Sequence, residues 1–124
     1  MPRHALLVLL ALILACSSPR KDPPPGDTVK EFYGAIFLGQ PEKALELCST
    51  QMREFAGDSA LLHNFTALSR RAANETLNLR ILEERVDDDY AVVVFGPGTD
   101  PGARDSVQLI LESGVWRMAL GRPD

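Results

Sequence analysis

The side chains that could carry proton-transfer chemistry in this chain are two phenols, an arginine and an aspartate. Tyr33 and Tyr90 are the phenols, and Arg80 and Asp105 fall on or beside expected strands. Burial of two such groups in one cavity would shift their pKa values and make general acid–base catalysis feasible. No charged residue interrupts an otherwise apolar strand face, however, so the apolar positions are equally well explained as core. The sequence leaves a catalytic pocket open without requiring one.

The sequence gives little support for other kinds of reactive site. The sequence contains no glycine-rich phosphate loop, no pair of cysteines spaced for zinc and no pair of histidines on a helix. His63 could act as a base, but a lone histidine on a helix is typical of a surface or boundary position. The run Asp87-Asp88-Asp89 could offer oxygens to calcium, although three consecutive carboxylates cannot all point at one ion, which favours a solvated turn. We therefore expect no catalytic residue, no metal and no cofactor.

Cys16 has the most specific surroundings of any reactive side chain. A short basic start leads into the apolar run Ala5 to Ala15, and small polar residues follow Cys16. This pattern is typical of a secretory signal peptide. The run is too short for a stable membrane span, which needs about 20 apolar residues. The last four residues of the pattern, Ile13-Leu14-Ala15-Cys16, resemble the lipobox of bacterial lipoproteins.

The lipobox resemblance implies that residues 1–15 are removed and that Cys16 carries acyl chains. Two or more chains hold a protein firmly, because each buried methylene contributes about 0.8 kcal/mol. Ser17 stands where an aspartate would signal inner-membrane retention in the enterobacterial pattern. The resemblance therefore implies a lipid-anchored protein of the cell envelope, at the outer membrane and facing the periplasm. An ordinary secreted protein with a cysteine near the cut is the alternative.

Length and composition limit the number of domains and the classes of function. Without its leader, a chain of 124 residues suits one small domain, and 45% hydrophobic with 24% charged residues is typical of a globular protein. The formal charge is −4 and becomes more negative when Arg3 is lost, so nucleic acid is a poor candidate for a partner. With Cys16 acylated, Cys48 has no disulfide partner, and its apolar neighbours predict a small buried hydrophobe.

The apolar pattern changes from helical to alternating along the chain. Residues 16–26 form a proline-rich spacer that we expect to stay off the fold. A helix is predicted from Asp27 or Thr28 to Gly39, with Thr28 and Glu31 as a capping box. Helical segments are predicted from Pro41, Thr50 and Asp58, and strands over Leu77 to Ile81, Tyr90 to Phe95, Val107 to Leu111 and Trp116 to Leu120. This order predicts an α+β domain over residues 27–120, with N-terminal helices packed on an antiparallel sheet and a tail over 121–124.

The pattern from Thr28 to Leu120 resembles the nuclear transport factor 2-like fold, particularly small bacterial lipoproteins with a domain of unknown function related to lumazine-binding-like proteins. The resemblance is carried by three segments: Val29-Lys30-Glu31-Phe32-Tyr33, Gly39-Gln40-Pro41-Glu42-Lys43-Ala44 and Ser113-Gly114-Val115-Trp116-Arg117-Met118. It implies a curved sheet wrapped around a long helix, in the cone shared with cystatin-like folds. Such cones often carry a pocket at the open end.

The resemblance implies two classes of function. The first is a non-catalytic module that binds a small apolar ligand, with Tyr33, Arg80 and Trp116 as candidate pocket residues, or that contacts an envelope protein or a second copy through the exposed sheet face. Trp116 is equally explained as core. The alternative is a periplasmic isomerase or hydrolase-like enzyme, because ketosteroid isomerase of this fold uses an aspartate base beside a tyrosine. A cone filled by Phe32, Phe65 and Trp116, with a wholly charged sheet surface, would count against both versions of the first class.

Overall fold

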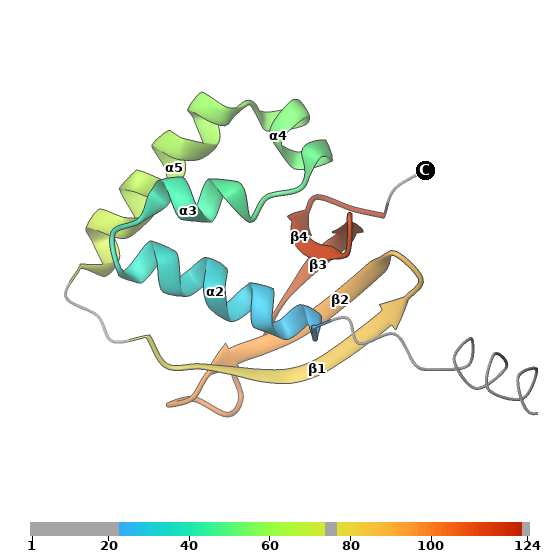
Figure 1. The fold of residues 1–124 in the computed structure, drawn as a ribbon. Helices are drawn as coiled ribbons and strands as arrows, with labels where there is room; N and C mark the ends of the chain where they lie inside the picture. Colours follow the sequence, from blue (N-terminus) through green and yellow to red (C-terminus); the bar gives the residue numbers. More distant parts are fainter. Residues whose placement is uncertain (1–22, 74–76, 123–124) are drawn as a thin grey trace, which may run out of the picture.

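The computed structural model describes residues 23–73 and 77–122, so the leader, Cys16 and most of the spacer lie outside the described residues. Within these residues, four helices come first and four strands follow. Figure 1 shows their arrangement. The helices are α2 (Pro25–Phe37), α3 (Pro41–Glu46), α4 (Thr50–Ala56) and α5 (Asp58–Ala72). The strands are β1 (Leu79–Asp87), β2 (Tyr90–Pro97), β3 (Asp105–Glu112) and β4 (Val115–Ala119).

The strands form an antiparallel meander in the order β1-β2-β3-β4. Tight turns join β1 to β2 and β3 to β4, and their left-handed positions are Asp88 (φ 54°), Ser113 (φ 52°) and Gly114 (φ 79°). An irregularity between Ile81 and Glu83 shifts the pairing of β1 with β2, which is typical of a bulge that bends a strand. The structure confirms the predicted α+β class, with helices covering one face of a curved sheet (Figure 1).

The core lies between α2 and the sheet. Val29, Phe32 and Ile36 recur at helical spacing and are all buried on α2. They meet the inner face of the sheet, where Ala91, Val93 and Leu109 are fully buried. The remaining core residues are mostly apolar side chains of α3, α5 and β4 and of the segment that follows α3: Ala44, Leu47, Cys48, Leu61, Phe65, Trp116 and Met118.

The segment between α3 and α4 is tied directly to the last strand. The Met118 amide donates to the Leu47 carbonyl over 2.8 Å, and the Ser49 amide donates to the Met118 carbonyl over 2.7 Å. Cys48 thereby forms a parallel bridge with Met118. Ser49 is fully buried, and its Oγ accepts a hydrogen bond from the Met52 amide over 3.1 Å, which caps α4. One short segment thus closes an edge of the sheet and starts a helix.

Two sequence predictions about the first helix are wrong. The helix begins at Pro25, so the last two residues of the spacer predicted over 16–26 do not stay off the fold: Pro25 and Gly26 are buried, and the Gly26 amide donates to the Glu84 carboxylate over 2.6 Å. Proline is tolerated in the first turn of a helix because its missing N–H has no helical partner there. Thr28 is therefore inside the helix, and its hydroxyl donates to the Trp116 carbonyl over 3.1 Å instead of capping.

The first strand also differs from its prediction. It starts at Leu79 and continues to Asp87, whereas alternation favoured Leu77 to Ile81. The bulge after Ile81 breaks the alternation, and from Glu83 on the strand is exposed and, apart from Val86, charged, so the apolar signal stops halfway along the strand. Among the described residues, no helix has the length and apolar character needed to cross a membrane.

Replacing Ser49 by alanine tests the link between α4 and the sheet. Ser49→Ala removes the oxygen that accepts from the Met52 amide, and we expect a loss of about 1 kcal/mol in the free energy of unfolding. Urea denaturation followed by circular dichroism measures it. Ser59→Ala, at an exposed position in the first turn of α5, is the matched control and should change stability by far less. An equal loss in both variants would contradict the capping role.

Candidate functional site

The middle of the cone is filled by side chains. The rings of Phe32 and Phe65 meet edge to face at 5.2 Å, and the Trp116 side chain is only 3% exposed. These three residues belong to one apolar core cluster. A ligand therefore has no room at the centre, and space has to be sought at the two ends of the cone.

An apolar pocket of about 290 Å³ opens at one end, between the last turns of α2, the start of β1 and the end of β2. Its lining is dominated by ring and aliphatic side chains, with Asn78 and Thr99 as polar members: Tyr33, Phe37, Leu77, Leu79, Phe95 and Pro97. The Gly98 amide donates to the Asn78 carbonyl over 2.8 Å, so the residue after β2 is bonded to the residue before β1. The volume is near the lower limit of ligand pockets, commonly about 300–1,000 Å³. This pocket suits a small, mostly apolar molecule.

Tyr33 supplies the titratable group of this pocket. Its ring packs edge to face on Phe32 at 5.2 Å and tilted on Phe95 at 5.3 Å, so the phenol is held by aromatic contacts on two sides. Burial raises the Tyr33 pKa, and the negative charge of Asp105, which pairs with Phe95 across β2 and β3, raises the pKa further. No other described residue hydrogen-bonds to the Tyr33 hydroxyl. The phenol is therefore neutral at neutral pH and free to bond a ligand.

The other two residues named as pocket candidates lie elsewhere. Arg80 is exposed on β1, between the half-buried Leu79 and Ile81, and is not part of the pocket lining. Trp116 is in the core, where its backbone carbonyl accepts the Thr28 hydroxyl hydrogen bond. Of the three, the structure brings only Tyr33 to a pocket. Phe37, Leu77 and Phe95 complete the pocket, and their apolar character alone could not distinguish them from core.

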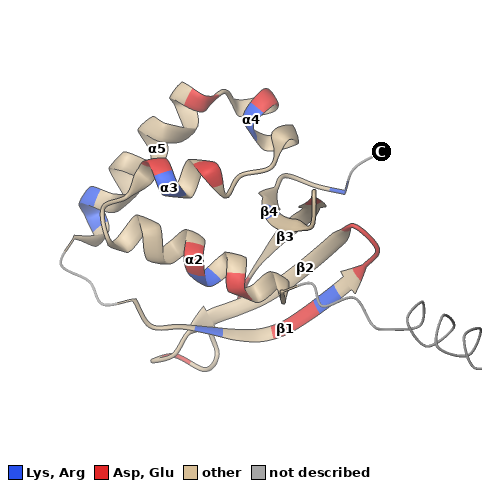
Figure 2. Cartoon of the chain, in the orientation of Figure 1, with Lys and Arg blue, Asp and Glu red and all other residues tan. Residues whose placement is uncertain are grey.

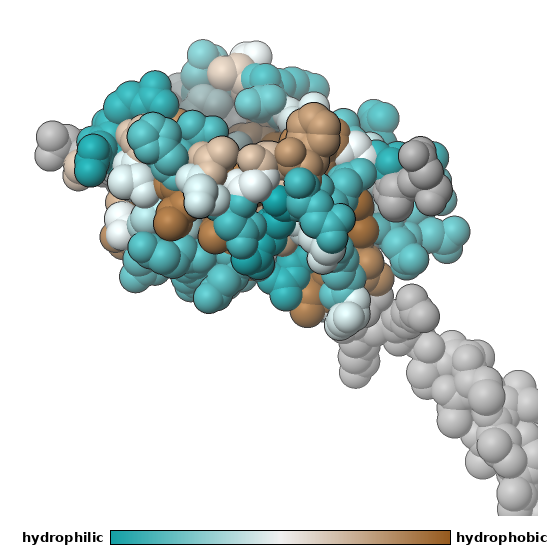
Figure 3. Space-filling view, turned by 90° about the horizontal axis from the view of Figure 1, so that it is seen from above, coloured by the Kyte–Doolittle hydropathy of each residue, from teal (hydrophilic) through white to brown (hydrophobic). Residues whose placement is uncertain are grey.

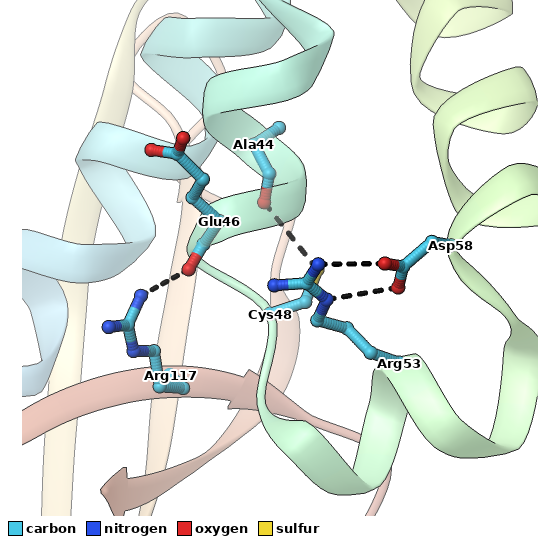
Figure 4. Close-up of polar contacts among 6 residues, drawn as sticks. All are labelled: Ala44, Glu46, Cys48, Arg53, Asp58 and Arg117. Atoms are coloured by element: carbon cyan, nitrogen blue, oxygen red, sulfur yellow. Dashed lines mark hydrogen bonds and ion pairs between the residues drawn. The ribbon is translucent and has the colours of Figure 1, made fainter. Parts of the chain in front are cut away.

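A second hollow, of about 630 Å³, lies where α3 and α4 approach the β3–β4 turn, and we call it the polar groove. It is lined by Glu46, Cys48, Thr50, Arg53, Glu112, Ser113 and Arg117, several of which appear in Figure 4. These residues come from two segments about sixty positions apart, and nothing in their local sequence indicated that they meet.

Cys48 forms part of the groove lining but is not a nucleophile. Cys48 is only 3% exposed. Its thiol donates to the Ala44 carbonyl, one helical turn back, over 3.5 Å (Figure 4). Burial raises the Cys48 pKa to about 11, with smaller and opposed effects from Arg53 and Asp58. Because the thiolate is the reactive form, the thiol is inert at neutral pH. The prediction of a buried hydrophobe is confirmed for this position.

His63 and the aspartate run occupy exposed positions. His63 lies on the outer surface of α5, and Asp88 and Asp89 form the turn between β1 and β2. Asp87 pairs with Arg122, and the turn is a red, acidic tip in Figure 2. Within residues 23–73 and 77–122, no group of three or more histidine, cysteine, aspartate or glutamate residues is placed to hold a metal ion.

The outer face of the sheet is mixed in character. Val92 and Val94 are half-buried and alternate with the fully buried Ala91 and Val93, so they face away from the core. On the edge strand the exposed pair Glu83 and Arg85 is bonded side to side over 2.7 Å. The sheet surface is therefore not wholly charged. A protein partner or second copy on this face stays a prediction.

Comparison with known proteins supports the fold. No protein-family model matches the chain, and no curated protein sequence matches it. Among solved structures, it is similar to one described as a calcium/calmodulin-dependent protein kinase type II association domain from Thiobacillus denitrificans, with a TM-score of 0.60, 14% identity, 81% of this chain covered and 93% of that one. It is also similar to one described as an NTF2-like transpeptidase from Campylobacter jejuni, with a TM-score of 0.55, 17% identity, 80% of this chain covered and 100% of that one. The chain therefore has the nuclear transport factor 2-like fold expected from its sequence.

The position of Tyr33 predicts an alkaline transition. Its pKa lies above 10.0, so the stability it contributes is present below pH 10 and is lost as pH rises through the folded-state pKa. The difference in ultraviolet absorbance between the protein and Tyr33→Phe should give a phenol titration with its midpoint above pH 10. Asp105→Asn should lower that midpoint while leaving it above 10, since burial is the larger cause. A midpoint at or below 10 in the unsubstituted protein would contradict the burial of the phenol.

Proposed function

We propose that this chain is a non-catalytic binding protein of the bacterial cell envelope, tethered by a lipid on Cys16, that binds a small and mostly apolar ligand beside Tyr33. The observation that carries the proposal is the apolar pocket at the open end of the cone, with Tyr33 in its lining. The filled core directs ligands to that end.

The chemistry of the lining defines the ligand. Aromatic and aliphatic surfaces from Phe37, Leu79 and Phe95 favour an apolar body, since its burial contributes about 25 cal/mol per Å² removed from water. The Tyr33 hydroxyl gives one directional hydrogen bond at neutral pH. A volume of about 290 Å³ corresponds to about ten water molecules at their liquid volume, so the ligand is the size of one or two fused rings.

The placement of the helix keeps the pocket clear of the tether. The spacer enters the fold at Pro25, the first residue of α2, whereas Tyr33 and Phe37 lie on the second half of that helix. At 1.5 Å per residue, the twelve steps from Pro25 to Phe37 separate the two ends by about 18 Å. The tether point and the pocket are therefore at opposite ends of α2 (Figure 1). A lipid on Cys16 would leave the pocket mouth accessible.

A periplasmic enzyme is the alternative, and Tyr33 with Asp105 is the observation that favours it. The charge of Asp105 raises the Tyr33 pKa, so the two groups interact electrostatically. A raised pKa makes the phenol a hydrogen-bond donor and leaves Asp105 as the only base of the pair. Asp105 is exposed, and its carboxylate accepts from the Ser106 amide over 2.8 Å. A solvated carboxylate at the rim is a poorly placed base, which favours binding over catalysis.

A charged residue in the pocket wall should abolish ligand binding. The probe is 1-naphthylamine, a neutral dye of two fused rings whose emission moves to shorter wavelength in apolar surroundings. We expect saturable binding to the intact protein and a loss of at least tenfold in affinity for Phe37→Arg, because the guanidinium would place a charge in the apolar lining.

The matched control for the dye experiment is Phe55→Arg. Phe55 is 82% exposed on α4, outside the pocket, and receives the same change. The helical side of the molecule is mostly hydrophilic, with apolar residues in separate small groups, as Figure 3 shows. Unchanged binding in Phe55→Arg is expected. Equal loss in both variants, or no loss in Phe37→Arg, would locate the dye elsewhere and overturn the pocket assignment.

Acylation should depend on one of the two cysteines. Cells supplied with radioactive palmitate should label the protein and its Cys48→Ala variant, and Cys16→Ala should lose the label and leave the membrane fraction. The comparison is matched because each variant removes one thiol. Labelling that survives Cys16→Ala, or an uncut precursor with an unmodified Cys16 thiol, would remove the tether from the proposal and leave the pocket untouched.

A further inference from the structure

The polar groove contains two arginines in different states. Arg53 holds Asp58 side-on, with Nε at 2.9 Å and Nη2 at 2.7 Å from the two carboxylate oxygens (Figure 4). Arg117 donates from Nη1 to the Glu46 backbone carbonyl, and its Nε and Nη2 have no acceptor among the described residues. This Nε–Nη2 edge is the one with which Arg53 binds a carboxylate. Arg117 therefore presents a preformed, unoccupied carboxylate-binding edge.

A carboxylate lies on the same face of the sheet as Arg117. Arg117 pairs with Ile110 across β3 and β4, and Glu112 is two residues further along β3, so the two are diagonal neighbours. Diagonal neighbours are about 7–8 Å apart. The Glu112 oxygens accept from the Thr50 amide at 3.1 Å each, and these contacts fix the carboxylate while leaving lone pairs free. Glu112 makes no ion pair with any described residue.

The charges of the groove favour a ligand that carries both signs. Arg53 is already paired with Asp58, which leaves Arg117 beside Glu46 and Glu112, so the open charges of the groove are of both signs. No ion pair joins Arg117 and Glu112 among the described residues, so each keeps bonding capacity. Their backbone positions are about 7–8 Å apart, comparable to the length of two extended residues, about 7 Å.

We propose that the polar groove binds a short peptide with free termini, its carboxylate on the Nε–Nη2 edge of Arg117 and its ammonium on Glu112. Thr50 and Ser113 line the same groove. The Ser113 hydroxyl can bond the peptide unit between the termini, and the Thr50 hydroxyl, which donates to Glu112 over 3.4 Å, can still accept from it. The volume of about 630 Å³ accommodates side chains of such a peptide as well as its backbone. This site is separate from the Tyr33 pocket in position and in chemistry.

Titration of the intact, isotope-labelled protein with L-alanyl-L-alanine tests the proposal by nuclear magnetic resonance. We expect saturable shifts of the Thr50 and Ser113 amides. The dipeptide amide, which lacks the carboxylate, and the N-acetyl dipeptide, which lacks the ammonium, should each bind at least tenfold more weakly. Equal binding of either analogue, or no shifts at millimolar dipeptide, would overturn the proposal.

Substitutions separate the two terminal contacts. Arg117→Gln should weaken dipeptide binding at least tenfold, and Glu112→Gln should abolish the preference for the free dipeptide over its N-acetyl form, while its carbonyl still accepts from Thr50. Arg122→Gln, an exposed arginine paired with Asp87, is the matched control and should bind normally. Normal binding by Arg117→Gln would overturn the proposal.

Two further measurements keep the result interpretable. If the loss of the Glu46 contact unfolds Arg117→Gln, Arg117→Lys keeps the charge without the paired donors and should still lose affinity relative to the control. Tyr33→Phe should bind the dipeptide normally, so failure in the polar groove and failure in the Tyr33 pocket are distinguishable. Normal dipeptide binding by Arg117→Lys and Glu112→Gln together would locate the peptide outside this site.

Discussion

The packing of α2 across the inner face of the sheet is the constraint on which the rest of the structure depends. The small residues Ala35 on the helix and Ala91 on β2 are almost fully buried in the core cluster between them. The helix is fixed at its start by the Gly26–Glu84 and Thr28–Trp116 hydrogen bonds. At its end, the Gln40 amide donates to the Ala35 carbonyl over 2.8 Å, and this hydrogen bond holds the start of α3 to the end of α2. Both hollows are therefore positioned by one helix.

The filled core explains why the two candidate sites differ in chemistry. A close-packed interior leaves few voids, so ligand space is found where the layers diverge. At one end α2 runs past the start of β1, and the exposed parts of core residues such as Tyr33 and Phe95 form an apolar wall. At the other end the α3–α4 segment is bonded to β4, and the side chains that surround it are the polar ones of helix ends and a turn. Each site has the polarity of the elements that meet there.

The sequence predicted the fold where the pattern is strictly periodic. Val29, Phe32 and Ile36 repeat at helical spacing, and Val107, Leu109 and Leu111 alternate along β3 and pack in or against the core, so both elements and these core-facing positions followed from periodicity. The pattern gave a wrong prediction where a side chain bonds to a residue that is distant in the sequence. Thr28 matches a capping box, but its hydroxyl bonds to a carbonyl 88 residues away, and no local pattern contains that partner.

The candidate sites were harder to predict than the fold for a related reason. Tyr33 could be named because phenols are few, whereas Arg80 could not be excluded, since alternation does not tell which end of a strand borders a pocket. The bulge after Ile81 could not be predicted from the sequence either. The polar groove depends on Thr50 meeting Glu112, a separation of 62 residues, so only the assembled sheet places its charges together.

The unpaired cysteine links the structure to the proposed compartment. In an oxidising envelope, a free thiol is exposed to disulfide exchange at a rate that depends on its thiolate fraction and on access. Cys48 is buried against the helix carbonyl of Ala44, and burial raises its pKa to about 11, so both factors are suppressed at neutral pH. Its backbone also bridges β4, and its side chain is buried in the core cluster. A small apolar residue is what this position requires, and a protonated thiol meets that requirement without needing a disulfide partner.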